Sequence, residues 1–320
     1  MASFTWAGMQ RAWPPTPAGD PAFQACRSPV RWNRGGPESC DEVMATRAYK
    51  VAARPGGVRW PRVSKAPFSV ICEVEPATRP DLMHVRHQIG VLSRVASSFL
   101  IPDNHIGRAT VSSIAVAHEV ALMGGRSIAC LNARDRNVLG FRRDLLTAAA
   151  YGVDQFLFVY GDRPEHGSRS DDLTVRSMLD EARQFAATAE LAPGPFRLGV
   201  TSRLRALPDW KREADFLFVQ VSFSVDALLR WRSATDFDGP VFAGVMAPAS
   251  ATMARKLSAD IPELAVPDSL IAALDNDRDA GVEYACQMVT EIRDSEAFDG
   301  VHLIPVSRYR EVAERLEGIV

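Results

Sequence analysis

The chain has 320 residues, a formal net charge of -2 and 47% hydrophobic residues, which is typical of a globular protein large enough for one barrel or two smaller domains. This charge balance gives no electrostatic reason to expect a nucleic acid or an acidic membrane surface as a partner, so a small polar metabolite is the expected ligand. No run approaches the roughly 18 apolar residues that cross a bilayer, so we expect no membrane span.

Residues 1–65 differ from the rest of the chain. They contain four of the six tryptophans among proline, glycine and arginine, and they show neither a helical nor a strand period. We expect a poorly ordered extension, which lacks the apolar core of a secretory signal. Met44 stands shortly before the organised region, so a mis-assigned start codon explains the extension better than a functional tail. The catalytic domain is expected over residues 66–320.

Apolar strand-like runs alternate with amphipathic helix-like segments from Pro67 onward, which is typical of βα repeats. The expected strands are Phe68–Glu75, Ser98–Pro102, Ser127–Leu131, Phe156–Tyr160, Phe196–Thr201, Asp215–Ser222, Pro240–Val245 and Val301–Val306. The expected helical segments are Asp81–Ala96, Ile114–Met123, Leu139–Tyr151, part of Leu173–Ala189, the short crossover Leu204–Ala214, Val225–Ser233, Ala251–Ser258, Asp268–Leu274, Ala280–Arg293 and Tyr309–Leu316.

Eight strands with eight crossovers in about 250 residues predict an α/β fold, a single-domain (β/α)8 TIM barrel. A doubly wound open sheet is the alternative. It is disfavoured because no GxGxxG follows the first strand.

The cysteines and histidines show no pattern of a disulfide framework or a metal site. The five cysteines lie far apart without CxxC spacing, and the six histidines include no HExxH. We therefore expect reduced thiols, a cytoplasmic protein and no metal ion.

Polar residues close several of the apolar strands, at the end where a parallel barrel carries its chemistry. In chain order they are Glu73, Glu75, Asp103, Asn104, Asn132, Arg134, Asp162, Gln220 and Arg308. Taken singly, each of these residues except Glu73 is better explained as part of a solvated rim than as a catalytic residue. Asp162 stands in the segment Gly161-Asp162-Arg163-Pro164, directly after the buried run Phe156–Tyr160, where it either shapes a turn or takes part in the chemistry.

Glu73 is the best candidate for an acid catalyst. Alternation in ICEVEPA sends Cys72 and Val74 to one face and Glu73 with Glu75 to the other, which we expect to face the barrel lumen. Desolvation disfavours the charged form of a carboxylic acid, so a glutamate in the lumen can donate a proton near neutral pH. The alternative is a buried glutamate that pairs with an arginine, Arg134 or Arg308.

Four short motifs occur in a fixed order along the chain: E-x-E-P in the first strand, GDRP after the fourth, VQ in the sixth, and GVHL leading to an arginine after the eighth. In this order and at these strand positions they resemble the methylenetetrahydrofolate reductases. The resemblance extends from Phe68 to the C-terminus.

The resemblance implies reduction of 5,10-methylenetetrahydrofolate to 5-methyltetrahydrofolate, with hydride from NADH or NADPH. It makes Glu73 the acid that protonates the folate N10, and Asp162 the carboxylate that supports positive charge on the folate. It further implies that Gln220 contacts the pterin or the nicotinamide and that Arg308 lies near the folate tail. We also expect Asn132, at the end of the third strand, to contact the substrate.

The chain departs from the family where the flavin is held. Tyr160 replaces the arginine that helps to hold the flavin diphosphate, Pro102 replaces a threonine after the second strand, and the segment after the fifth strand is much shortened. The family's aromatic residue after the seventh strand falls near Ala251. The chain thus resembles a divergent branch that works without flavin, and FAD is a doubtful cofactor. An FAD-dependent version of the same reductase and a non-catalytic folate-binding barrel are the alternatives, and the oligomeric state is left open.

Overall fold

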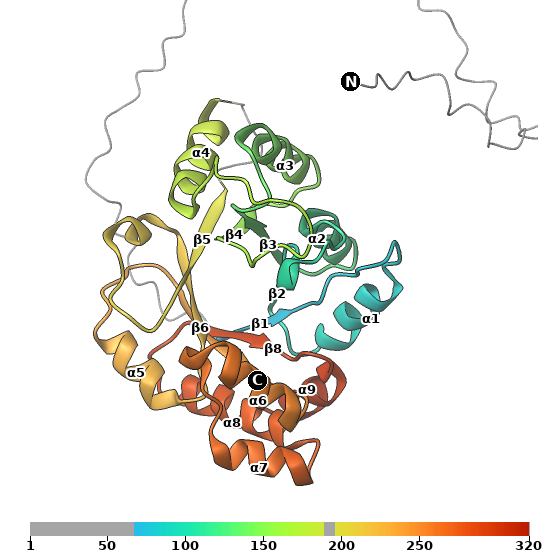
Figure 1. The fold of residues 1–320 in the computed structure, drawn as a ribbon, viewed down its shortest axis with the longest axis vertical. Coiled ribbons are helices and arrows are strands. Elements are labelled where there is room, and N and C mark those ends of the chain that lie inside the picture. Colours follow the sequence, from blue (N-terminus) through green and yellow to red (C-terminus); the bar gives the residue numbers. More distant parts are fainter. Residues whose placement is uncertain (1–66, 189–195, 320) are drawn as a thin grey trace, which may run out of the picture. The chain divides into compact units, whose positions relative to one another are not determined.

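The computed structural model describes residues 67–188 and 196–319. Within these ranges, eight parallel strands close into a barrel in chain order, and the last strand pairs with the first. Figure 1 shows the helices around the outside of the strands. The predicted (β/α)8 TIM barrel is therefore confirmed. The extension predicted over residues 1–65 lies outside the described residues.

The elements follow the predicted order. The strands are β1 (Ser69–Glu73), β2 (Ser98–Ile101), β3 (Ser127–Asn132), β4 (Gln155–Val159), β5 (Arg197–Ser202), β6 (Phe216–Val221), β7 (Val241–Met246) and β8 (Gly300–Ile304). The helices are α1 (Met83–Leu92), α2 (Ser113–Leu122), α3 (Val138–Ala150), α4 (Val175–Thr188), α5 (Val225–Ser233), α6 (Ala251–Asp260), α7 (Asp268–Asn276), α8 (Ala280–Asp294) and α9 (Tyr309–Leu316), with short 3-10 turns η3 (His105–Gly107), η4 (Asp209–Glu213) and η5 (Pro262–Leu264). Among these described helices, each is too short or too polar to span a membrane.

Two strand ends differ from the prediction by two residues, and the other strand boundaries lie within one residue of it. β1 ends at Glu73 and β8 ends at Ile304, each two residues earlier than expected. Pro305 follows β8 directly and lacks the N–H that another residue would offer to a neighbouring strand. The predicted helix between β5 and β6 is the short turn η4.

The strands are apolar on both faces because each face meets a different part of the core. On β1, Val70 and Cys72 pack into the layer between strands and helices, whereas Ile71 belongs to a cluster in the lumen. The other buried members of this lumen cluster are Leu100, Ile128, Cys130, Leu157, Phe216 and Phe218. Such two-sided burial is typical of parallel sheets. The lower lumen is thus packed with apolar side chains, so polar groups lie only beyond it.

Side-chain caps begin three of the helices directly after their strands. Asn137 Oδ1 accepts a hydrogen bond from the N–H of Gly140 at 2.8 Å at the start of α3, and Ser224 and Ser250 cap α5 and α6 in the same way. These caps satisfy N–H groups that a helix leaves unpaired. They also fix where the loops after β3, β6 and β7 end.

The cysteines in the described ranges are unpaired. Cys72, Cys130 and Cys286 are buried, whereas Cys26 and Cys40 lie outside the described residues. Burial raises the pKa of the Cys72 thiol to about 12. A thiol in this environment is a poor nucleophile.

Closure of the barrel depends on a close backbone contact at Gly300. This residue begins β8, opposite Ser69 of β1 and Phe242 of β7. A Cβ atom on Gly300 would lie 2.1 Å from the carbonyl oxygen of Ser69. Because the obstacle is backbone, no side-chain rotation can relieve the overlap.

We expect Gly300→Ala to lower the free energy of unfolding by about 2 kcal/mol, since β1 and β8 must separate to admit the methyl group. Urea unfolding followed by circular dichroism measures the change. Gly318→Ala is the control, because no heavy atom lies within 4 Å of a Cβ placed there. Equal stability of the two variants would contradict this account of closure.

Candidate functional site

Glu73 ends β1 with its side chain in the lumen. It follows Ile71 of the lumen cluster by two residues, whereas Cys72 and Val74 face the helices. This is the orientation that strand alternation predicts, and the Glu73 side chain is 15% exposed. Glu75 lies beyond β1 and is exposed. The structure therefore places one glutamate of the pair in the lumen.

His302 of β8 contacts the Glu73 carboxyl group. Its Nε2 lies 3.2 Å from Glu73 Oε2, and its ring packs edge-on against Phe218 with centroids 5.2 Å apart. Ile71 lies opposite His302 in the pairing of β1 with β8, so the strand register brings the two side chains together. The pair thus sits above the apolar cluster that fills the lower lumen.

Sequence reasoning missed His302 as a site residue. Its neighbours Val301 and Leu303 face the helices. Side chains alternate along a strand, so the sequence of β8 could have indicated that His302 faces the lumen. The alternative partners suggested for Glu73 are engaged elsewhere, because Arg134 pairs with Asp135 and Arg308 pairs with Asp279.

Gln220 lies in a bulge of β6. Pairing with β7 shifts between Phe218 and Val221, so β6 carries one residue more than its partner. Gly244 lies opposite, and a Cβ there would come within 2.5 Å of the carbonyl oxygen of Val219. Bulges re-aim side chains beside active sites. Within the described residues the Gln220 carboxamide has no hydrogen-bond partner, so it is free to bind a ligand.

Asn132 ends β3 and is fully buried. Its Nδ2 donates hydrogen bonds to carboxylate oxygens of Asp103 at 2.8 Å and Asp135 at 2.9 Å, and its Oδ1 accepts one from the Asp135 N–H at 2.9 Å. Both ends of the carboxamide are used within the protein. The structure thus places this predicted substrate-binding residue beneath the loops after β2 and β3.

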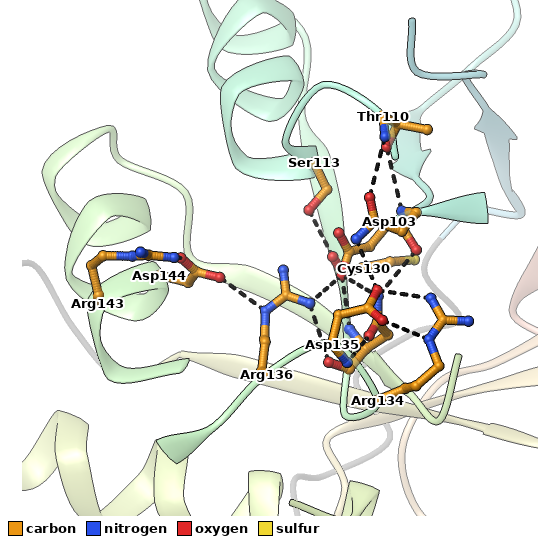
Figure 2. Close-up of polar contacts among 11 residues, drawn as sticks. Asp103, Thr110, Ser113, Cys130, Arg134, Asp135, Arg136, Arg143 and Asp144 are labelled. Atoms are coloured by element: carbon orange, nitrogen blue, oxygen red, sulfur yellow. Dashed lines mark hydrogen bonds and ion pairs between the residues drawn. The ribbon is translucent and has the colours of Figure 1, made fainter. Parts of the chain in front are cut away.

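The same loops are tied by ion pairs, which Figure 2 shows around Asp135 and Arg136. Arg136 pairs with Asp103 and, at 2.9 Å, with Asp144. Arg134 donates two hydrogen bonds to the Asp135 carboxylate, at 2.6 and 2.7 Å. Burial by itself would raise the pKa of Asp135, but the hydrogen bonds from Arg134 and its neighbours lower it to about 2. The Asp135 carboxylate therefore stays ionised at neutral pH.

One terminal NH2 group of Arg134, that of Nη1, has no hydrogen-bond partner among the described residues. The Arg134 side chain is 2% exposed. The pKa of the guanidinium is raised, first by the hydrogen bond to Asp135, with the charges of Asp162 and Asp103 adding to the effect. Asp162 therefore lies within electrostatic range of Arg134 at the mouth of the barrel.

Asp162 joins the loop after β4 to the loop after β2. Its Oδ2 accepts a hydrogen bond from the Ile106 N–H at 3.0 Å, and Ile106 has a φ of +58°, a strained value for a β-branched residue. A Cβ on Gly107 would lie 2.0 Å from the carbonyl oxygen of Arg163, and the Glu165 N–H donates to the Gly107 carbonyl at 2.9 Å. These contacts form a clasp between the two loops. The exposed carboxylate of Asp162 serves this clasp at the rim.

Arg308 is the residue directly before α9 and is 9% exposed. Its guanidinium pairs with Asp279, and its Nε lies 3.3 Å from Glu311 Oε1 without the geometry of a hydrogen bond. Arg308 was predicted to bind substrate. In the structure its guanidinium forms ion pairs within the protein, and these pairs hold the segment after β8.

A guanidinium lies beside Tyr160 although the sequence lacks an arginine at that position. Arg169 donates a hydrogen bond to Tyr160 Oη, and its guanidinium carbon is 5.6 Å from the centre of the tyrosine ring. Arg169 also pairs with Asp171 at 2.9 Å. Reasoning from strand ends could not find Arg169, because it lies nine positions after Tyr160 in the loop that follows β4.

The site combines a carboxyl group, an imidazole and a carboxamide. Glu73 and His302 lie together above the apolar cluster of the lumen, and the Gln220 carboxamide has no hydrogen-bond partner among the described residues. Within the described ranges no group of three or more His, Cys, Asp or Glu residues is placed to hold a metal ion. The arrangement suits acid-assisted chemistry on a small polar molecule.

No family model matches the chain, and no curated protein matches it. Among solved structures, an uncharacterised protein from Clostridium thermocellum, described as binding two copies of 5-methyl-5,6,7,8-tetrahydrofolic acid, has a TM-score of 0.56 and 12% identity, covering 80% of this chain and 97% of that chain. An EDTA monooxygenase from Chelativorans sp. BNC1 has a TM-score of 0.47 and 10% identity, covering 79% of this chain and 93% of that one. At such identity the first match shows a shared barrel fold.

Replacing Asp135 tests the ion network. Its pKa of about 2 lies below the ordinary value of 3.8, so its ionised form stabilises the folded state above about pH 4 and this contribution is lost as the pH falls toward 2. We expect Asp135→Asn to lower the free energy of unfolding at pH 7 by about 2 kcal/mol and to flatten its pH dependence between pH 5 and 2.

Urea unfolding at a series of pH values measures this effect. Asp154→Asn is the control, because Asp154 is exposed on the approach to β4 and its carboxylate has no partner in the described part of the chain. The same pH dependence in the wild type and Asp135→Asn would refute the stabilising role of the network.

Proposed function

We propose that this protein reduces 5,10-methylenetetrahydrofolate to 5-methyltetrahydrofolate with hydride taken directly from NADH. The observation that carries the proposal is the Glu73 carboxyl group in an apolar lumen, 3.2 Å from His302 Nε2. A carboxyl group so placed suits general acid catalysis. The order of the sequence motifs supplies the identity of the substrate.

The reaction needs a proton at N10 and a hydride at the one-carbon unit. When N10 is protonated, its bond to the methylene carbon breaks, the bonding electron pair stays on N10, and a 5-iminium cation forms on the folate. NADH supplies the hydride, which adds to the methylene carbon and gives the 5-methyl product with NAD⁺. Glu73 loses one proton in each turnover and regains it from solvent.

In this proposal Glu73 and His302 act as a unit. Glu73 holds the proton for N10, and His302 Nε2 orients the carboxyl group by the contact on its other side. Phe218, a member of the apolar cluster in the lower lumen, packs against the histidine ring and helps to fix its orientation. Positioning of this kind lowers the entropic cost of proton transfer.

The remaining residues bind and balance charge. Gln220 offers its free carboxamide to the polar edge of the pterin, and Asp162 adds negative charge from the rim toward the cation. Asn132 and Arg308 act through the loops that their protein contacts hold, rather than by direct contact with the folate.

The structural neighbour from Clostridium thermocellum supports a folate ligand. Its description names 5-methyltetrahydrofolate, which is the product of the proposed reaction. That protein shares the barrel fold with this chain, which makes a folate the first ligand to test.

An FAD-dependent version of the reductase is the second candidate. The observation that favours it is the guanidinium of Arg169 beside Tyr160, which returns a positive charge to the place where the family holds the flavin diphosphate. The iminium cation is itself a strong hydride acceptor, so flavin is chemically dispensable. Direct transfer therefore remains the leading proposal.

We expect the purified protein to oxidise NADH only when methylenetetrahydrofolate is present, and Glu73→Gln to lower kcat at least about a hundredfold while folate binding is kept. The amide keeps the size of the side chain but cannot donate an acid proton. NADH absorbance measures turnover, and calorimetry measures folate binding.

Two further variants sharpen this test. His302→Asn should lower kcat less than Glu73→Gln and leave the folate dissociation constant within about twofold, whereas Glu314→Gln, on the exposed face of α9, should change neither. Full turnover by Glu73→Gln would exclude it as the acid. Folate binding without NADH oxidation in the wild type would favour a non-catalytic folate-binding barrel.

An absorption spectrum separates the two cofactor proposals. We expect colourless protein, because direct transfer needs no flavin. A flavin band in the visible region that copurifies with the protein and bleaches on addition of NADH would establish the FAD-dependent version instead.

A further inference from the structure

Three positively charged side chains gather at the carboxyl end of β5. Arg203 and Arg205 follow the strand directly, and Lys211 comes from the turn η4. Lys211 Nζ donates a hydrogen bond to the carbonyl oxygen of Thr201 at 2.6 Å, which fixes the ammonium group at the strand end. In a parallel barrel this is the same end at which Glu73 closes β1.

Nearby carboxylates balance only one of the three charges. Arg203 lies 3.1 Å from Glu263, in an ion pair whose side chains are both 58% exposed. Within the described residues no carboxylate pairs with Arg205 or Lys211. An exposed pair such as Arg203–Glu263 contributes little and can exchange partners.

The acidic residues of η4 are used elsewhere. Asp209 lies 3.6 Å from Arg212, and Glu213 lies 3.5 Å from Arg183. Both carboxylates lie near other arginines, so neither acidic residue of η4 pairs with Lys211.

The three cations affect one another. The pKa of Lys211 is lowered, first by burial and then by the charges of Arg205 and Arg203. The Trp210 ring lies 5.3 Å from Lys211 Nζ and shields one side of the ammonium from water. An anion placed among these groups would relieve the repulsion and gain charge-assisted hydrogen bonds.

We propose that Arg203, Arg205 and Lys211 form a subsite for the anionic tail of the ligand whose reactive end lies at Glu73 and Gln220. β5 and β6 are neighbours, with Ser202 opposite Val219, so the strand end that leads into the subsite pairs with β6 next to the bulge that holds Gln220. The inference rests on the proposed function for the identity of the ligand. Its chemistry is that of carboxylates or phosphates, which the glutamyl tail of a folate and the diphosphate of NADH both provide.

Calorimetric titration of the full chain tests the subsite and separates the two sources. The ligands are 5-methyltetrahydropteroyl triglutamate, 5-methyltetrahydropteroate, which lacks the glutamyl tail, and NADH. We expect Arg205→Gln and Lys211→Met to weaken the tail-bearing ligand about tenfold and the tailless one less than twofold. Arg255→Gln, an exposed arginine of α6 that pairs with Asp275, is the control and should bind all three ligands as the wild type does.

The outcomes decide between the sources. If the variants lose affinity only for the triglutamate, the subsite binds the folate tail. If they lose affinity only for NADH, it binds the diphosphate. If they lose affinity for both ligands, the two share the subsite. Unchanged binding in both variants overturns the proposal, and so does an equal loss for the tailed and tailless folates. Circular dichroism checks folding, and Arg205→Gln alone is decisive where Lys211→Met does not fold, because Arg205 is exposed.

Titration with free anions tests the subsite independently of the proposed function. If the wild type binds neither folate nor NADH, the proposed function fails, and pyrophosphate and γ-linked triglutamate are then titrated by themselves. Binding of either anion that Arg205→Gln weakens retains the subsite. Absent binding, or binding that the variant does not change, overturns it.

Discussion

The register between β1 and β8 is the constraint on which the candidate site depends. Gly300 lets the two backbones approach, and the resulting pairing sets Ile71 opposite His302. Two residues further along, Glu73 meets the histidine from the neighbouring strand. A shift of one residue would turn either side chain toward the helices. The geometry of the Glu73–His302 pair is therefore a property of the closed barrel rather than of any loop.

The polar residues at the mouth of the barrel form two groups, one on the strands and one in the loops, and different contacts hold each group in place. Glu73, His302 and Gln220 stand on strands whose positions the apolar cluster below them holds. The loops after β2 and β3 are instead held by buried ion pairs and by Asn132, whose hydrogen bonds are spent within the protein. The strand-borne side chains are thus held by apolar packing, and the loops around them are held by charged and polar contacts.

Much of this architecture is readable from the sequence because it rests on local periodicity. Two-sided apolar runs identify the strands, and alternation orients Glu73. The bulge at Gln220 is not readable, because it arises from the pairing of β6 with β7 and from the missing side chain of Gly244. Nor is the position of Arg169 beside Tyr160, which depends on the path of the loop between them. The sequence identifies polar residues at strand ends, but it does not show which of them already have hydrogen-bond partners within the protein. Asn132 is such a residue.

The clasp between the loops after β2 and β4 links two segments that lie far apart in the sequence. Ile106 keeps its unfavourable backbone conformation while Asp162 accepts its N–H, and Gly107 has no room for a side chain against Arg163. An insertion or deletion in one loop would leave the other without its partner. Across related proteins, these two loops should therefore vary in length together, and their sequences should change as a coupled pair.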